Sequence, residues 1–270
     1  MSQVSVLMGI YNCADTLEEA VNSIINQTFT DWELIMCDDC STDNTLAVAQ
    51  ELAKKDSRIK VIKNEKNLTL APTLNRCLEV ASGKYVARMD GDDVCDPTRF
   101  EKEFKVLESH DCYAIVSCNM NLYDNRGIYR VIKYKELPQK QDFITGSQFC
   151  HAGCMVRTEA IKAVNGYSES MYYKRVEDYD LWVRMYRAGY IGYNIQEPLY
   201  SMRDDKNAIS RRTFDNRKNE IRVKKNIIKW FNLSKRNYIY ILITVLKAIT
   251  PSFIYKIAHK KAKLNFRRTA

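Results

Sequence analysis

Short, mostly apolar runs alternate with helix-like patterns over the first hundred residues. The runs have the length of buried strands and lie at 4–8, 32–36, 59–62 and 85–89. Between them, apolar residues recur three or four positions apart, as in an amphipathic helix. Helices are predicted on this basis at 15–25, with Asp15 as N-cap, at 43–54 and at 71–81. Strands and helices in this order predict a mostly parallel sheet with helices on both faces.

The second half of the chain is less regular. Helices are predicted at 98–109 and 176–188, and strands at 113–118 and 151–157. From residue 215 the pattern predicts a helix and then a basic amphipathic tail. With 270 residues, 46% of them hydrophobic, the chain can form one large α/β domain with an appendage.

Charge is distributed unevenly along the chain. No Asp or Glu follows Glu220, whereas 13 of the 42 Lys and Arg residues lie in the last 50 positions. The preceding body carries 29 basic and 33 acidic residues, so it is mildly acidic. This asymmetry favours an anionic partner for the tail, either a membrane surface or a nucleic acid.

The tail combines apolar runs with clustered cations. The runs 238–246 and 248–255 are separated by Lys247, and neither reaches the roughly 20 residues that span a bilayer. Six cations follow them: Lys256, Lys260, Lys261, Lys263, Arg267 and Arg268. The combination favours helices in the interface of an anionic membrane. The alternative is a helix packed on the body with a solvated basic end. Nucleic-acid binding is disfavoured, because the aromatic residues lie within the apolar run and form no stacking platform.

Nine cysteines, and a chain start that leads directly into a strand, predict reduced thiols in the cytoplasm. Cys37 and Cys40 have the spacing of a redox or zinc pair, and Cys150 and Cys154 flank His151. No second pair has zinc spacing, so we interpret these cysteines as buried or incidental thiols.

An acidic cluster follows the fourth predicted strand. Asp90, Asp92 and Asp93 place three carboxylates within four residues, where they repel one another. A hard divalent cation with oxygen ligands would relieve this repulsion and could carry a diphosphate. The alternative is a solvated acidic turn, since Asp-Gly is also common in turns.

Two other predicted strands end in polar residues that a ligand site could use. Tyr11 and Asn12 follow the first strand, and Asp38 and Asp39 end the second. Ligands of such sheets bind at the carboxyl ends of the strands. We therefore expect these residues and the acidic cluster around one crevice.

Four ordered motifs carry a resemblance to a known family. They are Met8-Gly9-Ile10-Tyr11-Asn12, Asp38-Asp39-Cys40-Ser41-Thr42-Asp43, Ala87-Arg88-Met89-Asp90-Gly91-Asp92-Asp93 and Glu177-Asp178-Tyr179-Asp180-Leu181-Trp182. In this order and spacing, over residues 4–210, the chain resembles bacterial family 2 glycosyltransferases of the GT-A fold.

The resemblance implies a role for each motif. Asp90 and Asp92 would hold Mn²⁺ or Mg²⁺ on the diphosphate, and Asp178 would be the catalytic base. Glu177 and Trp182 would contact the acceptor. The residues implied in nucleotide binding are Ile10, Tyr11, Asp38, Asp39, Asp90 and Gly91. The alternative for the acidic pair at 177–178 is a charge that favours the helix dipole.

The resemblance also implies a reaction and its partners. An inverting enzyme would move a hexose or N-acetylhexosamine from a nucleotide sugar, UDP-linked, to a saccharide hydroxyl. The acceptor would be linked to a lipid diphosphate in surface polysaccharide assembly (O-antigen, lipopolysaccharide or capsule), at the inner face of the cell membrane. We divide the chain into a glycosyltransferase domain, 1–214, with nucleotide-binding (1–97) and acceptor-binding (98–214) halves, and a tail, 215–270.

Other interpretations stay open at this point. Asp90 also fits the nucleophile of haloacid dehalogenase-type phosphatases, although three strand–helix units precede it here. A nucleotide-sugar-binding protein without activity is a further alternative. The sequence leaves the donor sugar, its base, the acceptor and linkage and the oligomeric state open.

Some positions depart from the family pattern. Gly9 stands where the family usually has proline, and Cys40 and Thr69 where it usually has glycine. The late loop at 202–205 lacks the usual histidine, which leaves Arg203, Arg211 or Arg212 as candidate diphosphate contacts. His151 matches a frequent family position, but we expect it to be mainly structural.

Overall fold

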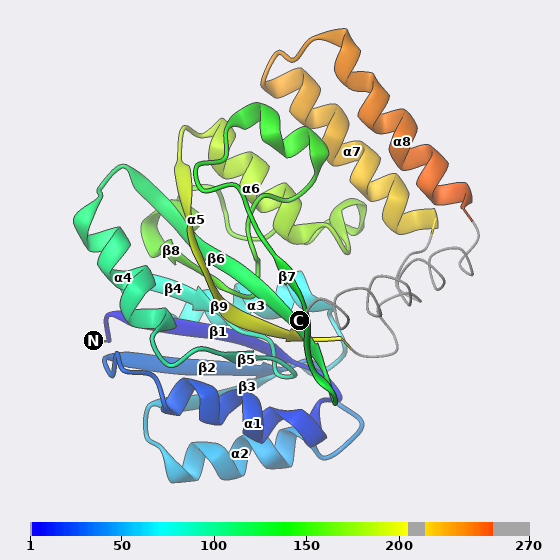
Figure 1. Cartoon of the computed structure of the whole chain (residues 1–270). Coiled ribbons are helices and arrows are strands. Elements are labelled where there is room, and N and C mark those ends of the chain that lie inside the picture. The colour runs from blue at the N-terminus through cyan, green and yellow to red at the C-terminus, as the bar shows by residue number, and fades with distance from the viewer. Residues whose placement is uncertain (1, 205–213, 251–270) are drawn as a thin grey trace.

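The computed structural model describes residues 2–204 and 214–250 and shows an α/β fold (Figure 1). The strands are β1 (Val4–Ile10), β2 (Trp32–Asp38), β3 (Ile59–Lys63), β4 (Tyr85–Arg88), β5 (Val94–Cys95), β6 (Tyr113–Asp124), β7 (Gly127–Ile132), β8 (Cys154–Arg157) and β9 (Ile191–Arg203). The α-helices are α1 (Ala14–Ile25), α2 (Thr45–Lys55), α3 (Leu70–Val80), α4 (Arg99–Ser109), α5 (Thr158–Ala163), α6 (Glu177–Arg187), α7 (Phe214–Trp230) and α8 (Tyr238–Ile249). Three short 3₁₀ helices are η1 (Lys140–Thr145), η2 (Met171–Tyr173) and η3 (Lys235–Asn237).

The described strands form one sheet in the order β3-β2-β1-β4-β8-β6-β9-β5, with β7 added to β6. Strands β1 to β4 pair in parallel, and β6 pairs in parallel with β9. Strand β8 runs antiparallel between β4 and β6 and so joins the two halves. The mostly parallel architecture predicted from the sequence is confirmed.

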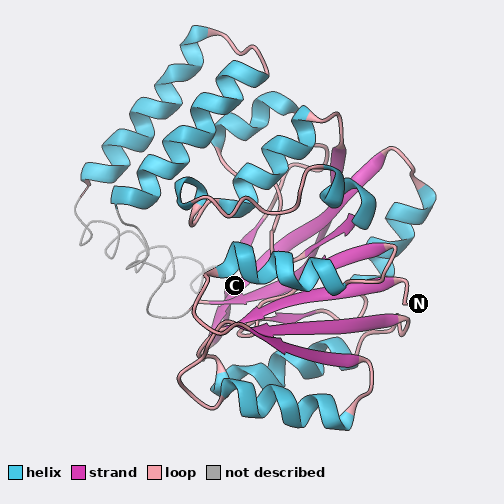
Figure 2. Cartoon of the chain, turned by 180° about the vertical axis from the view of Figure 1, so that it is seen from behind, coloured by secondary structure: helices cyan, strands magenta, loops and turns pink. Residues whose placement is uncertain are grey.

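Helices cover both faces of the sheet (Figure 2), as the alternating pattern predicts. In β1, Val6 and Met8 join a core cluster that includes residues of α1, α2 and α4. The intervening Leu7 joins a second cluster, with residues of α3, α5, α6 and α7. Alternate side chains of a strand point to opposite faces, so a strand apolar at both sets of positions is buried between two helix layers.

The second half shows where the sequence pattern was incomplete. Strands β5, β7 and β9 were not predicted, and β8 begins at Cys154 rather than at His151. The β6–β9 pairing carries three register shifts, two of which border the pair Asn119–Pro198. A proline cannot donate to the hydrogen-bond ladder and is tolerated at such irregularities. Because the pairing of β9 is irregular, its sequence lacks the regular alternation from which a strand is predicted.

The first helix begins one residue earlier than Asp15. Its N-cap is Cys13, whose carbonyl accepts hydrogen bonds from the backbone N–H groups of Thr16 and Leu17. Asp15 lies in the first turn instead, where its charge favours the helix dipole.

The helix α7 packs on the body. It contacts α6, η1 and η2, and Val223, Ile227 and Ile228 are buried in the second core cluster. The predicted domain boundary at residue 214 stays a prediction. The structure adds that α7 packs against elements that precede this boundary.

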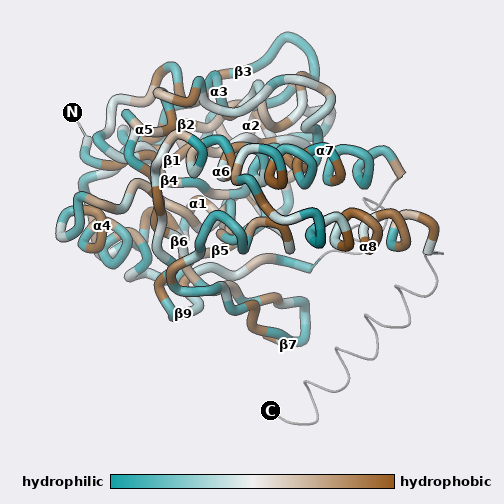
Figure 3. Tube along the Cα trace, turned by 90° about the horizontal axis from the view of Figure 1, so that it is seen from above, coloured by the Kyte–Doolittle hydropathy of each residue, from teal (hydrophilic) through white to brown (hydrophobic). Residues whose placement is uncertain are grey.

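The helix α8 packs on α7 and leaves an apolar face uncovered by the described residues. Lys224 of α7 is buried and donates a hydrogen bond of 2.8 Å to Thr244 of α8. Much of the α8 trace is coloured as hydrophobic in Figure 3. The large apolar side chains that lie exposed on this helix are Tyr238, Ile239, Leu242, Ile243, Val245, Leu246 and Ile249. In the described ranges, every helix is too short or too polar to cross a membrane. The basic cluster at 256–268 lies outside the described residues.

Candidate active site

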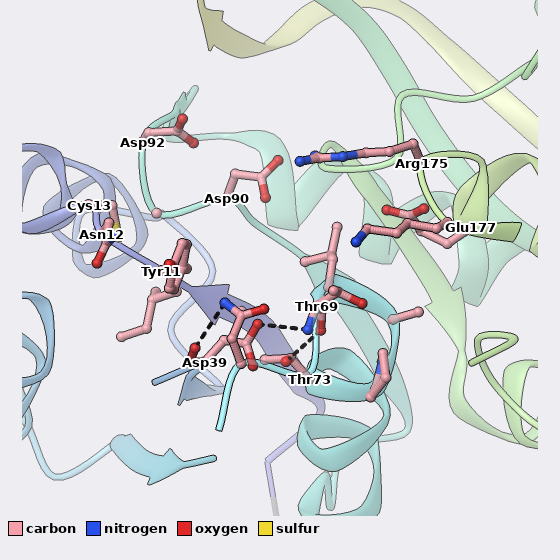
Figure 4. A pocket seen from close by; sticks show the side chains of 18 of the residues that line it. Tyr11, Asn12, Cys13, Asp39, Thr69, Thr73, Asp90, Asp92, Arg175 and Glu177 are labelled. Carbon is pink, nitrogen blue, oxygen red and sulfur yellow. Dashed lines mark hydrogen bonds between the residues drawn. The ribbon is translucent and has the colours of Figure 1, made fainter. Parts of the chain in front are cut away.

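A cleft of about 760 Å³ lies at the carboxyl ends of β1, β2 and β4 (Figure 4). This volume is within the usual range for small-molecule sites. The parallel strands bring the polar residues that end them to one edge, as the sequence analysis expected. Of the predicted site residues, the cleft is lined by Ile10, Tyr11, Asp39, Asp90, Gly91, Asp92 and Glu177.

The loop after β1 presents an aromatic ring to the cleft. Tyr11 is 49% exposed, whereas Ile10 before it is buried. Asn12 has a φ of 49°; its N–H donates to Ser41 Oγ at 3.1 Å, and its Oδ1 accepts from the N–H of Thr42 at 2.8 Å. These bonds fasten the β1 and β2 loops together and leave the Tyr11 ring free to stack on a planar ligand.

The two adjacent aspartates after β2 have different surroundings. Asp39 Oδ1 accepts from Asn64 Nδ2 and the N–H of Leu68, both at 2.7 Å, and Oδ2 accepts from the N–H of Thr69 at 2.9 Å. Asp38 is buried behind the cleft lining and accepts from the N–H of Ser41 at 3.1 Å. Asp39 therefore faces the cleft and orders the loop before α3, while Asp38 supports the loop after β2.

Thr69 adopts a backbone conformation that glycine normally occupies. Its φ is 73° and its ψ is 175°, a combination that is strained for a β-branched residue. The resemblance implies a glycine at this position, and the backbone conformation of Thr69 is one that favours glycine.

The acidic cluster brings three carboxylates together. Ligand atoms of Asp90, Asp92 and Asp93 lie within 4.8 Å of one another. Burial, and then the charges of Asp90 and Asp92, raise the pKa of Asp93 to about 8. Asp93 accepts hydrogen bonds from Tyr200 Oη and the N–H of Arg203, both at 2.7 Å. The oxygen donors and their mutual repulsion fit a hard cation such as Mg²⁺ or Mn²⁺.

Gly91 between these aspartates has no room for a side chain. A Cβ there would lie 2.9 Å from Cys13 Sγ and 3.2 Å from Ile10 Cγ2. The backbone of the cluster therefore packs directly on the start of α1, and Thr16 Oγ1 donates to the Gly91 carbonyl at 3.0 Å.

Arg203 at the end of β9 fastens the cluster from the other side. Its Nε donates to the Asp92 carbonyl at 3.1 Å, and its guanidinium pairs with Glu19 of α1. Of the three late-loop arginines considered from the sequence, Arg203 lines the cleft. Arg211 and Arg212 lie outside the described residues.

Arg88 is a buried cation behind the cluster that sequence reasoning missed. Its Nη2 donates to Asp90 Oδ1 at 2.6 Å, and its side chain is 3% exposed. Burial and the Arg88 charge lower the pKa of His151, whose Nε2 lies 2.9 Å from Tyr167 Oη. His151 is thus held neutral inside the protein, which agrees with the mainly structural role that we expected for it. For Arg88, the signal in the sequence was its position as a charged residue in an otherwise apolar strand.

The predicted acceptor residues separate in the structure. Glu177 is 9% exposed and lines the cleft, and burial, followed by the charge of Asp178, raises its pKa. Asp178 is half-buried in the first turn of α6, and burial raises its pKa. Trp182 is fully buried, with its ring centroid 5.6 Å from that of Phe149. This placement does not support a direct contact between Trp182 and an acceptor.

Lys174 and Arg175, just before α6, also line the cleft, and sequence reasoning missed both. Figure 4 shows the Arg175 side chain directed across the cleft toward Asp90. In the sequence, their position shortly before the acidic pair at 177–178 could have indicated that they belong to the site.

Residues 5–164 match the family model described as glycosyl transferase family 2. Over 264 residues the chain is 40% identical to EpsE of Bacillus subtilis (strain 168), which is named as a glycosyltransferase; the match covers 97% of this chain and 95% of that one. It is 32% identical over 180 residues to Escherichia coli WfgD, named as a UDP-Glc:alpha-D-GlcNAc-diphosphoundecaprenol beta-1,3-glucosyltransferase, covering 67% and 68% of the two chains.

Solved structures share the fold. S. aureus TarS (residues 1–349), in complex with UDP-GlcNAc, superposes with a TM-score of 0.72 at 18% identity, covering 91% of this chain and 72% of that one. The mannosyltransferase PcManGT from Pyrobaculum calidifontis, in complex with GDP-Man and Mn²⁺, gives a TM-score of 0.66 at 15% identity, covering 99% and 82%. The predicted GT-A fold is confirmed.

Proposed function

Because the chain belongs to glycosyl transferase family 2, we propose that this glycosyltransferase uses a UDP-sugar and a divalent cation in the cleft. The transferred group is a hexose or N-acetylhexosamine, and the acceptor is a saccharide hydroxyl. The observation that carries the proposal is the placement of Asp90 and Asp92 on the cleft that Tyr11 and Asp39 also line. Membership of this family argues against the phosphatase alternative, in which Asp90 is a nucleophile.

The donor end of the cleft suits a nucleotide. The exposed Tyr11 ring offers a stacking surface for the base, and the Asp39 carboxylate offers an acceptor for a base N–H. The TarS structures include complexes with UDP and UDP-GlcNAc, and WfgD is named for UDP-Glc. These likenesses favour UDP over other nucleotides.

Asp90 and Asp92 are the residues that would hold Mn²⁺ or Mg²⁺, with Asp93 behind them. A divalent cation there would offset the charge that develops on the departing diphosphate. Arg88 holds Asp90 from behind, so the carboxylate is oriented before any ligand arrives.

Asp178 is our candidate for the catalytic base. An acceptor oxygen attacks the anomeric carbon, the bond from that carbon to the UDP oxygen breaks, and UDP leaves with the electron pair. Asp178 takes the proton of the acceptor hydroxyl, and a raised carboxylate pKa suits this role. One displacement inverts the anomeric centre. Glu177, on the cleft wall, is proposed to orient the acceptor.

The acceptor we propose is a saccharide on a lipid diphosphate, used in surface polysaccharide assembly at the inner face of the membrane. WfgD is named for a diphosphoundecaprenol acceptor, and the B. subtilis relative TuaG is named for teichuronic acid biosynthesis. The exposed apolar face of α8 supports peripheral membrane contact. Lys235, Arg236 and Lys247 lie on or beside this helix, and cations next to apolar side chains favour an anionic bilayer.

Thermal unfolding with UDP, GDP or dTDP, each with Mn²⁺ or with EDTA, tests the proposal. A ligand at 100 times its Kd stabilises a protein by about 2.7 kcal/mol. We expect UDP to raise the Tm in Mn²⁺ and not in EDTA, and Asp92→Ala to abolish the rise. A protein that no nucleotide stabilises in Mn²⁺ would contradict the proposed donor site.

A further inference from the structure

The cleft contains few cations for a site that is to receive a diphosphate. Seven carboxylates line it: Asp15, Asp39, Asp43, Asp90, Asp92, Glu169 and Glu177. Its basic lining residues are Lys174, Arg175 and Arg203. Arg203 is engaged with Glu19 and with the Asp92 carbonyl. A diphosphate among these carboxylates needs positive charge beyond a metal ion, because like charges in a confined site repel.

Arg175 is placed to supply that charge. Its side chain is exposed, and in Figure 4 it extends across the cleft toward Asp90. Among the described residues it forms no ion pair with a carboxylate, and its charge partly offsets the rise that burial causes in the pKa of Glu177. The cation therefore faces the acidic cluster from the opposite wall, with the open cleft between them.

The backbone holds Arg175 in this position at a cost. Its φ is 67°, which is unfavourable for a residue with a side chain and is often found where a residue contacts a ligand. Val176, next along the chain, is buried and is the N-cap of α6. The strained turn lets Val176 enter the core while Arg175 points into the cleft.

Neighbouring elements keep that turn in place. Ser170 caps η2 by accepting from the N–H of Tyr172. Asn219 of α7, which is buried, donates to the carbonyls of Met171 and Lys174 at 3.2 and 3.0 Å. The segment leading to Arg175 is thus fastened at both ends before any ligand binds.

From this placement we infer that Arg175 binds the nucleotide diphosphate, on the cleft wall opposite Asp90 and Asp92. The inference rests on the proposed function. An arginine presents a planar fork of N–H donors that matches phosphate oxygens, whereas a lysine offers a point charge. Arg175 and the metal site then contact the leaving diphosphate from two sides.

Binding of UDP and of uridine in Mn²⁺, measured by titration calorimetry, tests this role. Hydrogen bonds to charged groups contribute about 1.5–3 kcal/mol, so we expect Arg175→Gln to weaken UDP binding by about 10–100-fold. Uridine has no phosphate, and its affinity is expected to be unchanged. Arg175→Lys keeps the charge without the fork and is expected to lie between. The control is Arg126→Gln, in the exposed β6–β7 turn away from the cleft, with wild-type affinities.

The outcomes separate this inference from the proposed function. Equal UDP affinity in Arg175→Gln and wild type overturns the inference alone. Equal weakening of UDP and uridine also overturns it, because the residue would then shape the cleft rather than contact phosphate. A raised KM for the lipid-linked acceptor with unchanged UDP affinity assigns Arg175 to the acceptor instead. A wild type that binds neither ligand contradicts the proposed function itself.

Discussion

The side-chain amide of Asn219 on α7 donates a hydrogen bond of 3.0 Å to the main-chain carbonyl of Lys174 on the cleft wall. A helix that the sequence assigns to the tail therefore supports the segment between η2 and α6. Since that segment carries Arg175 and leads into Glu177, α7 contributes to the shape of the cleft.

Asn219→Ala is expected to loosen this wall. The substitution removes both donated hydrogen bonds and leaves two carbonyls to find other partners, at about 1–2 kcal/mol of unfolding free energy. Urea unfolding measures the stability, and UDP titration measures the cleft. The matched control is Asn226→Ala, which removes one bond from the same helix to Tyr173 Oη. A UDP affinity lowered no more by Asn219→Ala than by Asn226→Ala would contradict the link.

Asp178→Asn is expected to retain UDP binding and to lower transfer at least 100-fold, because the amide cannot take the acceptor proton. Glu177→Gln keeps a polar side chain on the cleft wall, and we expect its main effect to be a raised KM for the acceptor. Rates of sugar transfer at saturating UDP-sugar distinguish the two variants. Transfer at the wild-type rate in Asp178→Asn would remove Asp178 from the role of base.

Thr69→Gly is expected to stabilise the protein. The substitution relieves about 1–3 kcal/mol of backbone strain at the positive φ. The greater entropy of glycine in the unfolded chain lowers the resulting gain in stability by about 0.5–1 kcal/mol. The Thr69 N–H that donates to Asp39 is kept. The expected change is a gain of about 1 kcal/mol in urea unfolding, without loss of UDP binding. Thr69→Ala keeps a Cβ at the same φ and is expected to gain less, so an equal gain would count against strain as the cause.

The apolar face of α8 is expected to bind anionic vesicles. Replacing Ile239, Leu242 and Leu246 by Gln removes three exposed side chains of this face and should lower co-sedimentation with phosphatidylglycerol vesicles. Truncating α8 is a poorer test, because it also removes Thr244, the partner of buried Lys224. The control is Ile128→Gln on β7, which is equally exposed. Unchanged co-sedimentation of the triple variant would argue against membrane contact through α8.

Glu33 links stability to pH. Burial alone would raise its pKa, but hydrogen bonds from Lys60, Ser82 and Ser5 outweigh it and lower the pKa to about 2. A carboxylate with a depressed folded pKa stabilises the protein above its unfolded pKa, about 4.3, and this contribution disappears as the pH falls toward 2.

Glu33→Gln measures that contribution. We expect it to cost about 1–2 kcal/mol at pH 7, less than the full shift implies, because Lys60 is half-exposed and water screens its charge. In urea unfolding from pH 7 to pH 3, the gap between wild type and variant should narrow. A gap independent of pH would show that packing, not ionisation, sets the cost.

The sequence by itself determined the order of strands and helices from β1 to β4. The strands β1 to β4 are apolar and the helices between them amphipathic, so local periodicity encodes their order and their parallel pairing. Parallel pairing brings the ends of β1, β2 and β4 to one edge, which is why Tyr11, Asp39, Asp90 and Asp92 could be predicted to meet. The order of strands and helices along the chain is sufficient for this prediction.

The tertiary structure decided what depends on contacts between distant segments. Strand β9 carries irregular pairing beside Pro198, so no periodicity predicted it, yet it supplies Arg203 to the acidic cluster. The direction of a side chain at a helix start depends on packing, which turns Glu177 into the cleft and Trp182 into the core. Asn219 reaches the cleft wall only because α7 folds back on the body, a long-range contact that no local pattern encodes.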